Sequence, residues 1–291
     1  MPHPTLTPLL TAALTARAAL LAPPGKAAYR LFAGFYEGAP DLAADLYADT
    51  LVLHNYAQPS AAGAEGVRHA AAFYRAALPF LRSTVVKHRH AVDAADRRGV
   101  VMGDAPPATS ITEDGVRYRI DVLAARDAGF YLDTRAVRAL LKREMAGRTV
   151  LNTFAYTGSL GVAALAGGAA RVVQLDASRA VLNVAKDSCT LNGLPIHRGD
   201  YIADDFWVAT SRLRRADARF DCVILDPPFF ATAPTGTVDL AQQADRLINK
   251  VRPLVADGGR LIAINNALFL SGHAFMTILE GLCTSGFLSI E

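Results

Sequence analysis

One stretch of this 291-residue sequence joins a strand-forming run to residues that could do chemistry. The apolar residues 223–225 are followed directly by Asp226, Pro227, Pro228, Phe229 and Phe230. Because proline cannot donate to the ladder of a central strand, the strand must end at the carboxylate. Ligands of open α/β sheets bind at the carboxyl ends of strands. The stretch therefore predicts a functional site, and the alternative is a rigid turn.

The same residues have the properties needed to hold a nucleobase. Asp226 offers an acceptor, the two prolines present rigid carbonyl groups, and Phe229 or Phe230 offers a flat face. Enzymes that act on a base must take it out of its stack and hold it by an edge and a face.

A second candidate site lies at residues 152–159 (NTFAYTGS), after a predicted short strand. Glycine lets the backbone approach a ligand closely. The dinucleotide fingerprint G-x-G-x-x-G is absent, because Gly158 and Gly161 supply only its last two glycines and Tyr156 stands in place of the first. The loop fits a nucleoside ligand without a diphosphate, or it is an ordinary strand-to-helix turn.

Acidic residues follow the next two strands. Asp176 comes roughly 20 residues after the glycine loop, which is the spacing of a ribose-binding acid, although it could instead cap a helix. Asp204, Asp205 and Phe206 could bind the amino group of an adenine and cover its face. Asp200 competes for that role, and a solvated acidic loop explains this segment equally well.

The elements that must position these residues alternate between strands and helices after Thr134. The strands are predicted at 149–152, 172–175, 220–225 and 260–264, and helices at 134–145, 158–167, 178–191 and 241–254. This alternation predicts an α/β fold with a Rossmann-like, doubly wound parallel sheet.

The first part of the chain has a different pattern. It predicts a helix at 5–22, strands at 29–32, 46–53 and 84–88, and a helix at 64–81. An Asp114-Gly115 turn then predicts a hairpin over 111–118. We therefore expect an N-terminal helix (1–24), a small α+β domain that could contact RNA (25–110) and a second domain (111–291).

Bulk composition limits the class of protein. Hydrophobic residues make up 52% of the chain, but no apolar run approaches the roughly 20 residues that span a bilayer. The three cysteines show neither paired nor metal-ligand spacing, so a reduced cytoplasmic protein without a metal site is expected. The net charge of +3 is mildly basic, and basic clusters at 87–98, 142–148 and 212–219 are either solvated faces or an RNA footprint.

Several motifs together resemble the class I S-adenosylmethionine-dependent methyltransferases. Residues 129–135 (GFYLDTR), 151–158 (LNTFAYTG) and 225–230 (LDPPFF) look more closely like the bacterial 23S rRNA methyltransferases, a family with cytosine carbon-5 and guanine N7 enzymes. Residues 28–32 and 45–49 resemble the central α+β domain of that family.

The resemblance implies S-adenosylmethionine as cofactor and 23S rRNA as partner, and it leaves the oligomeric state open. The cofactor-binding residues that it implies are Asn152, Phe154, Tyr156, Gly158, Asp176, Asp204, Tyr131, Asp133 and Arg135. Asp226, Pro227, Pro228 and Phe229 are expected to face the target base as catalytic residues.

Two departures from that pattern bear on mechanism and extent. Cysteine-using relatives carry their nucleophile just after the fifth strand, where residues 264–268 read INNAL, and Cys222 falls inside a strand. The paired asparagines resemble the guanine N7 branch, so direct methyl transfer without a cysteine adduct is the hypothesis. The second departure is that residues 286–291 suffice for only one of two expected closing strands, so the domain is expected to lack its last strand.

Three alternatives to this hypothesis stay open. One is a cytosine carbon-5 RNA methyltransferase, and another is a methyltransferase of a small molecule or protein. The third is a non-catalytic RNA-binding relative.

Overall fold

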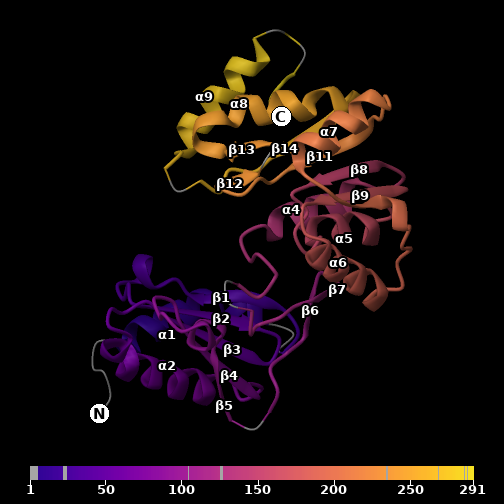
Figure 1. Ribbon diagram of the computed structural model, residues 1–291. Coiled ribbons are helices and arrows are strands. Elements are labelled where there is room, and N and C mark those ends of the chain that lie inside the picture. The colour runs from indigo at the N-terminus through magenta and orange to yellow at the C-terminus, as the bar shows by residue number, and fades with distance from the viewer. Residues whose placement is uncertain are drawn as a thin grey trace. The chain divides into compact units, whose positions relative to one another are not determined.

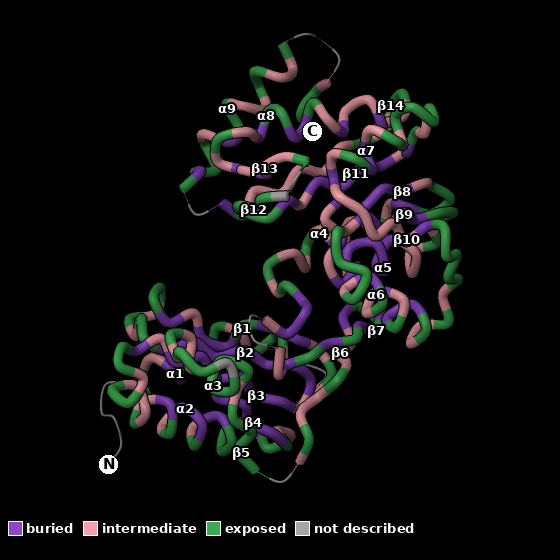
Figure 2. The backbone as a smooth tube through the Cα atoms, viewed as in Figure 1, coloured by how far each residue is buried: buried purple, intermediate pink, exposed green. Residues whose placement is uncertain are grey.

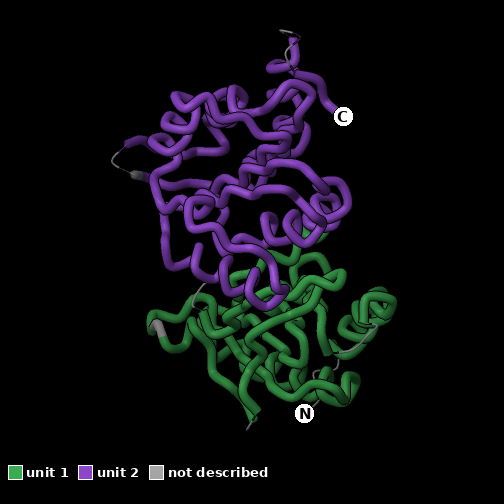
Figure 3. The backbone as a smooth tube through the Cα atoms, turned by 90° about the vertical axis from the view of Figure 1, so that its right-hand side faces the viewer, with its two compact units in different colours: residues 1–135 green, residues 136–291 purple. Residues whose placement is uncertain are grey.

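The chain forms two compact units, Met1–Arg135 and Ala136–Glu291 (Figure 3). The computed structural model describes residues 6–21, 25–103, 105–124, 127–233, 235–267, 269–284, 286 and 288–291. Each unit has its own sheet and its own hydrophobic core (Figures 1 and 2).

Unit 1 is built on a five-stranded sheet in the order β1-β2-β3-β4-β5. Its strands are β1 Ala28–Phe32, β2 Leu42–Tyr47, β3 Thr50–Asn55, β4 Ser83–His88 and β5 Val100–Met102. Only β3 and β4 pair in parallel, because helix α2 (Ala64–Ala77) carries the chain from one to the other. The predicted single strand 46–53 is wrong: Ala48 turns in the left-handed region at φ 53°, and Tyr47 pairs with Thr50 across a tight hairpin.

The two faces of this sheet have different roles. Helices α1 (Leu6–Ala16) and α2 cover one face, where Leu46, Leu51 and Leu53 pack against Leu10 and Tyr74. Because side chains alternate along a strand, residues one position away point to the opposite face. That face carries polar side chains, and a cavity lies over it.

Residues after β5 stay with unit 1. The predicted hairpin at 111–118 is present as β6 (Ser110–Glu113) and β7 (Val116–Arg119), with Asp114 and Gly115 at positive φ. Thr112 N donates to Lys26 O at 2.7 Å, which ties this hairpin to the first unit. The division between compact units accordingly falls at Arg135, later than the expected boundary at 110.

Further short elements complete unit 1. They are the 3-10 helices η1 Ala18–Leu21, η2 Gly34–Glu37 and η3 Ser60–Gly63, and the helix α3 Ala94–Arg98. Within the predicted helix 5–22, α1 and η1 are found, whereas Thr5 and Ala22 lie outside the described residues.

Unit 2 contains the expected doubly wound sheet, with every strand pair parallel and the order β10-β9-β8-β11-β14. These strands are β8 Thr149–Thr153, β9 Arg171–Asp176, β10 Tyr201–Ala203, β11 Phe220–Leu225 and β14 Val255–Ala263. The strand order reverses at β8, the topological switch point at which such sheets bind ligands. The Rossmann-like fold class is confirmed.

Helices cover both faces of this sheet. One face packs on α4 (Arg135–Glu144) and α5 (Ser159–Ala166) through Leu141, Leu160 and Cys222, and α6 (Arg179–Leu191) lies beside α5. The other face packs on α7 (Phe206–Arg215), α8 (Leu240–Val251) and α9 (Gly272–Cys283). A β-hairpin, β12 (Phe230–Ala233) with β13 (Gly236–Asp239), leads into α8, and η4 Arg198–Asp200 and η5 Arg252–Leu254 are short turns.

The last residues add no further strand to the sheet within the described chain. Gly286 and residues 288–291 are not in a strand, and Ser285 and Phe287 lie outside the described residues. Across the part of the chain that the structure describes, none of the helices is both long and apolar enough to span a membrane.

Candidate active site

The sheet of unit 2 brings most of the predicted site residues to one edge. Parallel strands β8, β9, β10 and β11 end at Thr153, Asp176, Ala203 and Leu225. The glycine loop, Asp176, Asp204 and Asp226 lie at or directly after these ends. Because the strands are parallel, their carboxyl ends share an edge, which is where the ligands of such folds bind.

The loop after β8 has an unusual backbone. Phe154, Tyr156 and Gly158 all lie in the left-handed region, at φ 53°, 52° and 74°. For residues other than glycine this conformation costs of order 1–3 kcal/mol each and persists only when the surroundings hold it. Tyr156 N donates to Asp176 Oδ2 at 2.9 Å, which fixes the loop to the end of β9.

A buried polar layer supports the loop from below. Asn152 Nδ2 donates to Gln174 Oε1 at 2.8 Å, and Gln174 Nε2 lies 3.4 Å from Gly158 O. A Cβ atom added at Gly158 would lie 2.4 Å from Ala185 Cβ, and one added at Gly161 would lie 2.3 Å from Gln174 Nε2. Gly158 is therefore required by its close approach to Ala185 as well as by its φ, whereas Gly161 lies against the end of the Gln174 side chain.

Asp176 serves both neighbouring segments. Besides Tyr156, its carboxylate accepts a hydrogen bond from Ser178 N at 2.9 Å, just before α6. The predicted alternative, in which Asp176 caps a helix, is thus partly right, because Ser178 precedes α6. The hydrogen bond to Tyr156 N is not explained by capping and links Asp176 to the glycine loop. Both carboxylate oxygens also keep a further lone pair for a ligand hydroxyl.

The acidic residues near β10 separate into different roles. Asp205 caps α7 by accepting from Trp207 N and Val208 N, and Asp204 Oδ2 pairs with Arg212 at 2.7 Å. Asp200 precedes β10 and pairs with Arg171 at the start of β9, so it lies at the opposite edge of the sheet. Asp204 therefore lies at the carboxyl edge, where an adenine could reach it, whereas Asp200 does not.

The aromatic side chains beside the loop are mostly packed. Phe206 is 5% exposed and stacks on Phe154 with ring centroids 4.5 Å apart. Trp207 contacts Phe206 edge-on, and the Arg246 guanidinium lies over its ring. Phe206 therefore stabilises the position of Phe154 and has little free face of its own to cover a base.

The corner after β11 is held by an asparagine from the neighbouring strand end. Asn266 Nδ2 donates to Pro227 O at 2.8 Å and lies 3.3 Å from Asp226 Oδ1. Phe229 is 38% exposed, and its ring lies 6.0 Å from that of Phe269, which is 81% exposed. The corner thus presents rigid carbonyl groups and exposed aromatic faces.

Comparison with known proteins identifies the family. The S-adenosylmethionine-dependent methyltransferase family model matches residues 29–279. The chain belongs to this family. It is 34% identical over 265 residues to ribosomal RNA large subunit methyltransferase I of Serratia proteamaculans, covering 86% of the chain and 64% of that protein. The Klebsiella pneumoniae protein of the same name is 31% identical over 93% of the chain and 68% of its own length.

Solved structures agree on the fold. The crystal structure of the methyltransferase SMU.776, complexed with SAH, has a TM-score of 0.82 at 24% identity and covers 96% of the chain and 72% of its own. A SAM-dependent methyltransferase from Streptococcus mutans has a TM-score of 0.80 at 21% identity, covering 98% of the chain and 73% of its own. At this identity the likeness concerns the fold alone.

The residues of this methyltransferase-family chain fit S-adenosylmethionine. Gly158 and Gly161 lie directly against Ala185 and Gln174, so the loop packs tightly on the polar layer that holds it at the edge of the sheet. Asn152 Oδ1 is buried and has no hydrogen-bond partner among the described residues. Asp176 adds a carboxylate at the end of β9, beside the switch point at β8, where the ribose of a nucleoside binds in folds of this type.

The thiol groups lie away from this edge. Cys222 is fully buried in the middle of β11, and burial raises the pKa of its thiol to about 12. Cys189 is buried in α6 beside the Tyr201 hydroxyl, and burial likewise raises the pKa of its thiol. Cys283 belongs to α9. Among the described residues, none of the His, Cys, Asp and Glu side chains group as a metal site would require.

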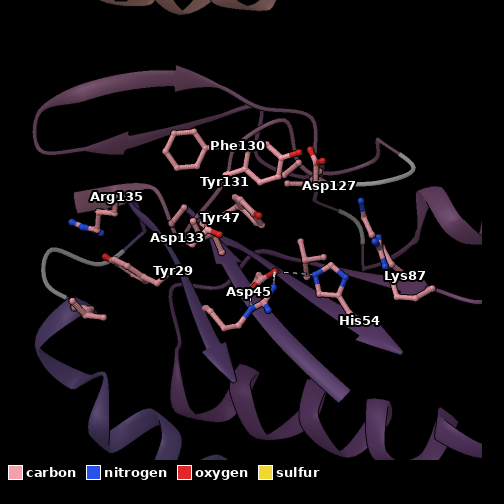
Figure 4. A pocket seen from close by; sticks show the side chains of 18 of the residues that line it. Tyr29, Asp45, Tyr47, His54, Lys87, Asp127, Phe130, Tyr131, Asp133 and Arg135 are labelled. Atoms are coloured by element: carbon pink, nitrogen blue, oxygen red, sulfur yellow. Dashed lines mark hydrogen bonds and ion pairs between the residues drawn. The ribbon is translucent and has the colours of Figure 1, made fainter. Parts of the chain in front are cut away.

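The remaining three predicted site residues belong to unit 1. Tyr131, Asp133 and Arg135 line a cavity of about 470 Å³ in that unit (Figure 4). Arg135 lies 3.8 Å from Glu113 and 3.5 Å from Asp114, and its guanidinium lies over the Tyr29 ring. The structure therefore divides the predicted site residues into two groups, one in each unit.

Sequence reasoning missed two contributors, Gln174 and Phe269, and it did not predict what Asn266 contacts. Gln174 supports the glycine loop, Asn266 holds the Asp226 corner, and Phe269 pairs with Phe229. Gln174 could have been found, because a single amide inside the apolar strand 171–176 signals a buried polar contact. In the sequence, Asn266 is marked only by its resemblance to a family branch, and nothing local marks Phe269.

Proposed function

We propose that this chain methylates a nucleobase of RNA, in large-subunit (23S) rRNA, by direct transfer from S-adenosylmethionine without a cysteine adduct. The chain spans 64% of the length of the Serratia proteamaculans relative, so the activity of the whole protein is part of this proposal. The relatives' names support rRNA as the substrate. The cysteines, all free thiols, support a cytoplasmic location.

One observation carries the proposal of direct transfer. At the corner that would face the base, Asn266 occupies the position beside Asp226 and Pro227, and all three cysteines of the chain lie elsewhere. A thiol must ionise to attack a base, and the buried Cys222 thiol resists ionisation because its pKa is near 12. The nucleophile is then the target atom of the base.

The proposed division of labour follows from the geometry. S-adenosylmethionine supplies a methyl group on a positively charged sulfur. The glycine loop and Asp176 hold the cofactor, and Asp204 lies at the same edge for the adenine. Asp226 and the carbonyl groups of Pro227 and Pro228 accept hydrogen bonds from the base edge, while Phe229 covers its face. Catalysis then comes from orientation, for which the rigid Asp-Pro-Pro corner is suited.

The experiment is transfer of tritiated methyl groups from S-adenosylmethionine to 23S rRNA and to a small-molecule and protein mixture. Digestion of the RNA to nucleosides and mass spectrometry identify the product. Incorporation into RNA alone is expected, and Asp226→Ala is expected to abolish it while retaining binding of SAH. Incorporation into protein or small molecules alone contradicts the proposal.

The mechanism has a separate test. Cys222→Ala, Cys189→Ala and Cys283→Ala are each expected to retain turnover, with thermal unfolding as the check on folding. RNA that carries 5-fluorocytosine traps enzymes that use a thiol adduct, and we expect no stable complex in denaturing gels. A trapped complex, lost in one cysteine variant, would establish the cytosine carbon-5 mechanism instead.

A further inference from the structure

The cavity of unit 1 has a polar floor and aromatic walls (Figure 4). Its floor comes from the sheet face opposite α1 and α2, where Arg30, Asp45, His54 and Lys87 stand on neighbouring strands β1 to β4. Phe130 and Tyr131 lie above the sheet, across from Tyr47. A volume of about 470 Å³ lies within the usual range of small-molecule pockets, roughly 300–1,000 Å³.

The floor is held by a charged network. Arg30 donates to both oxygens of Asp45, at 2.8 and 3.0 Å, and His54 Nε2 lies 2.9 Å from Asp45 Oδ2. Burial raises the pKa of Asp45, but the hydrogen bonds from His54 and Arg30 outweigh it and keep that pKa below its usual value. Asp45 is thus ionised, and its bond to His54 fixes the orientation of the imidazole.

His54 and Lys87 are polar side chains buried in the floor of the cavity, where they could contact a ligand. His54 is 7% exposed, and its Nδ1 is buried with no hydrogen-bond partner among the described residues. Because Asp45 accepts at Nε2, Nδ1 of a neutral ring is an acceptor. Lys87 is 1% exposed and donates to Ala124 O, and burial lowers the pKa of its ammonium group to about 8. Such costly groups in a cavity mark a binding site.

The mixture of groups fits a nucleotide. Donors and acceptors side by side suit the edge of a base, and tyrosine rings suit its face. Arg89 lines the cavity, and the exposed Arg97 and Arg98 of α3 follow it along the chain outside the lining. A free mononucleotide would not reach positive charges outside the cavity, whereas the phosphates of a longer strand can pair with them.

We propose that the cavity of unit 1 binds one unpaired nucleotide of single-stranded RNA, separate from the base that is methylated. The inference rests on the proposed function, because it assumes that the bound RNA is also the methyl acceptor. Tyr56 lines the cavity together with Tyr131. In this proposal their rings contact the base, so Tyr131 acts on RNA instead of the expected cofactor, and the floor around His54 and Lys87 contacts the edge of the base. This gives unit 1 a direct part in choosing the substrate.

The test compares two cavity variants of the full chain with two matched controls. Tyr56→Leu and Lys87→Met change the cavity. Tyr36→Leu removes a ring that is 87% exposed outside it, and Lys26→Met removes an exposed charge elsewhere in unit 1. Fluorescence anisotropy measures the affinity for a labelled single-stranded RNA and for the same sequence as a duplex, and calorimetry measures the affinity for SAH.

Tyr56→Leu is expected to weaken single-stranded RNA binding roughly 5- to 150-fold, the range for loss of one stacked base. Lys87→Met is expected to weaken it by about 10-fold or more, the range for loss of a hydrogen bond from a charged group. The controls should change it less than about two-fold, and SAH affinity should stay constant. Loss of SAH affinity with unchanged RNA binding would assign the cavity to the cofactor and overturn the inference, as would unchanged RNA binding alone. RNA binding that depends on the cavity in a chain without methyl transfer would refute the proposed function only.

A second measurement covers the case in which a variant fails to fold. The wild-type chain is crosslinked by light to single-stranded RNA that contains 4-thiouridine, and the attached peptides are identified by mass spectrometry. Crosslinks in residues 45–56 or 127–135 support the inference. Crosslinks confined to other segments refute it.

Discussion

The close packing of Gly158 allows a sharp test of the glycine loop. In Gly158→Ala, the new Cβ would lie 2.4 Å from Ala185 Cβ and 2.9 Å from Gln174 Nε2. It would also hold alanine at φ 74°. Gly193 makes a matched control, because it has φ 65° and nothing within 4 Å of an added Cβ.

The magnitudes follow from these two effects. The left-handed conformation costs an alanine roughly 1–2 kcal/mol, and this applies to both positions. Overpacking adds about 1–3 kcal/mol at Gly158 only. Gly193→Ala should therefore lower the free energy of unfolding by roughly 1–2 kcal/mol, and Gly158→Ala by about 2–5 kcal/mol.

The assay is urea unfolding followed by tryptophan fluorescence. The chain has one tryptophan, Trp207, in α7 of unit 2, so the signal reports this unit. Calorimetry with SAH adds the functional readout, in which Gly158→Ala should bind more weakly because the loop must shift, and Gly193→Ala should bind normally. Equal destabilisation by the two substitutions, or normal SAH binding by Gly158→Ala, would refute the packing argument.

Three further predictions concern charges and the base corner. Because the pKa of Asp45 is lower in the folded chain than the usual 3.8, the stability that its ionised carboxylate adds is complete above pH 3.8 and is lost as pH falls through the lower folded pKa. Asp45→Asn should cost about 3–5 kcal/mol at pH 7 and flatten this acid dependence. Urea unfolding followed by circular dichroism measures both effects, since Trp207 reports unit 2, whereas Asp45 and Lys87 belong to unit 1. The pKa of Lys87 is about 8 when folded against 10.5, so the stability of unit 1 should rise between these pH values, and Lys87→Met should remove the rise. Asn266→Ala removes the donor to Pro227 O and should lower kcat roughly 2- to 10-fold with unchanged SAH affinity; a change in SAH affinity instead would contradict the positioning role.

The fold of unit 2 could be predicted because its local signals agree with its topology. Apolar runs such as 223–225 end at polar or proline residues, and helices separate them, which leaves few arrangements besides a parallel sheet. The Asp114-Gly115 turn was equally clear, since glycine and aspartate are the residues that tolerate positive φ. The turn at Ala48 carries no such signal, so the sequence predicts one strand where the structure has two.

The cavity of unit 1 could not be predicted from the sequence. Asp45, His54 and Lys87 occupy alternate positions in their strands, which is the usual pattern of a face exposed to water. Their burial depends on residues 122–124 and 127–133, which follow much later in the chain and cover that face. Only the pairing of strands shows that Arg30 and Asp45 are neighbours.

Asp176 is expected to bind the cofactor ribose, yet it also holds Tyr156 N and Ser178 N. Loss of cofactor affinity in Asp176→Asn alone could therefore come from either effect. A double-mutant cycle separates them, with SAH and its 2′-deoxy analogue as the two ligands. We expect removal of the 2′-hydroxyl to weaken binding to the wild-type chain by about 1–3 kcal/mol. The effect on Asp176→Asn should be smaller, because the contact between the hydroxyl and Asp176 is already lost in that variant. If the two losses simply add, Asp176 acts through the loop alone and the ribose contact is refuted.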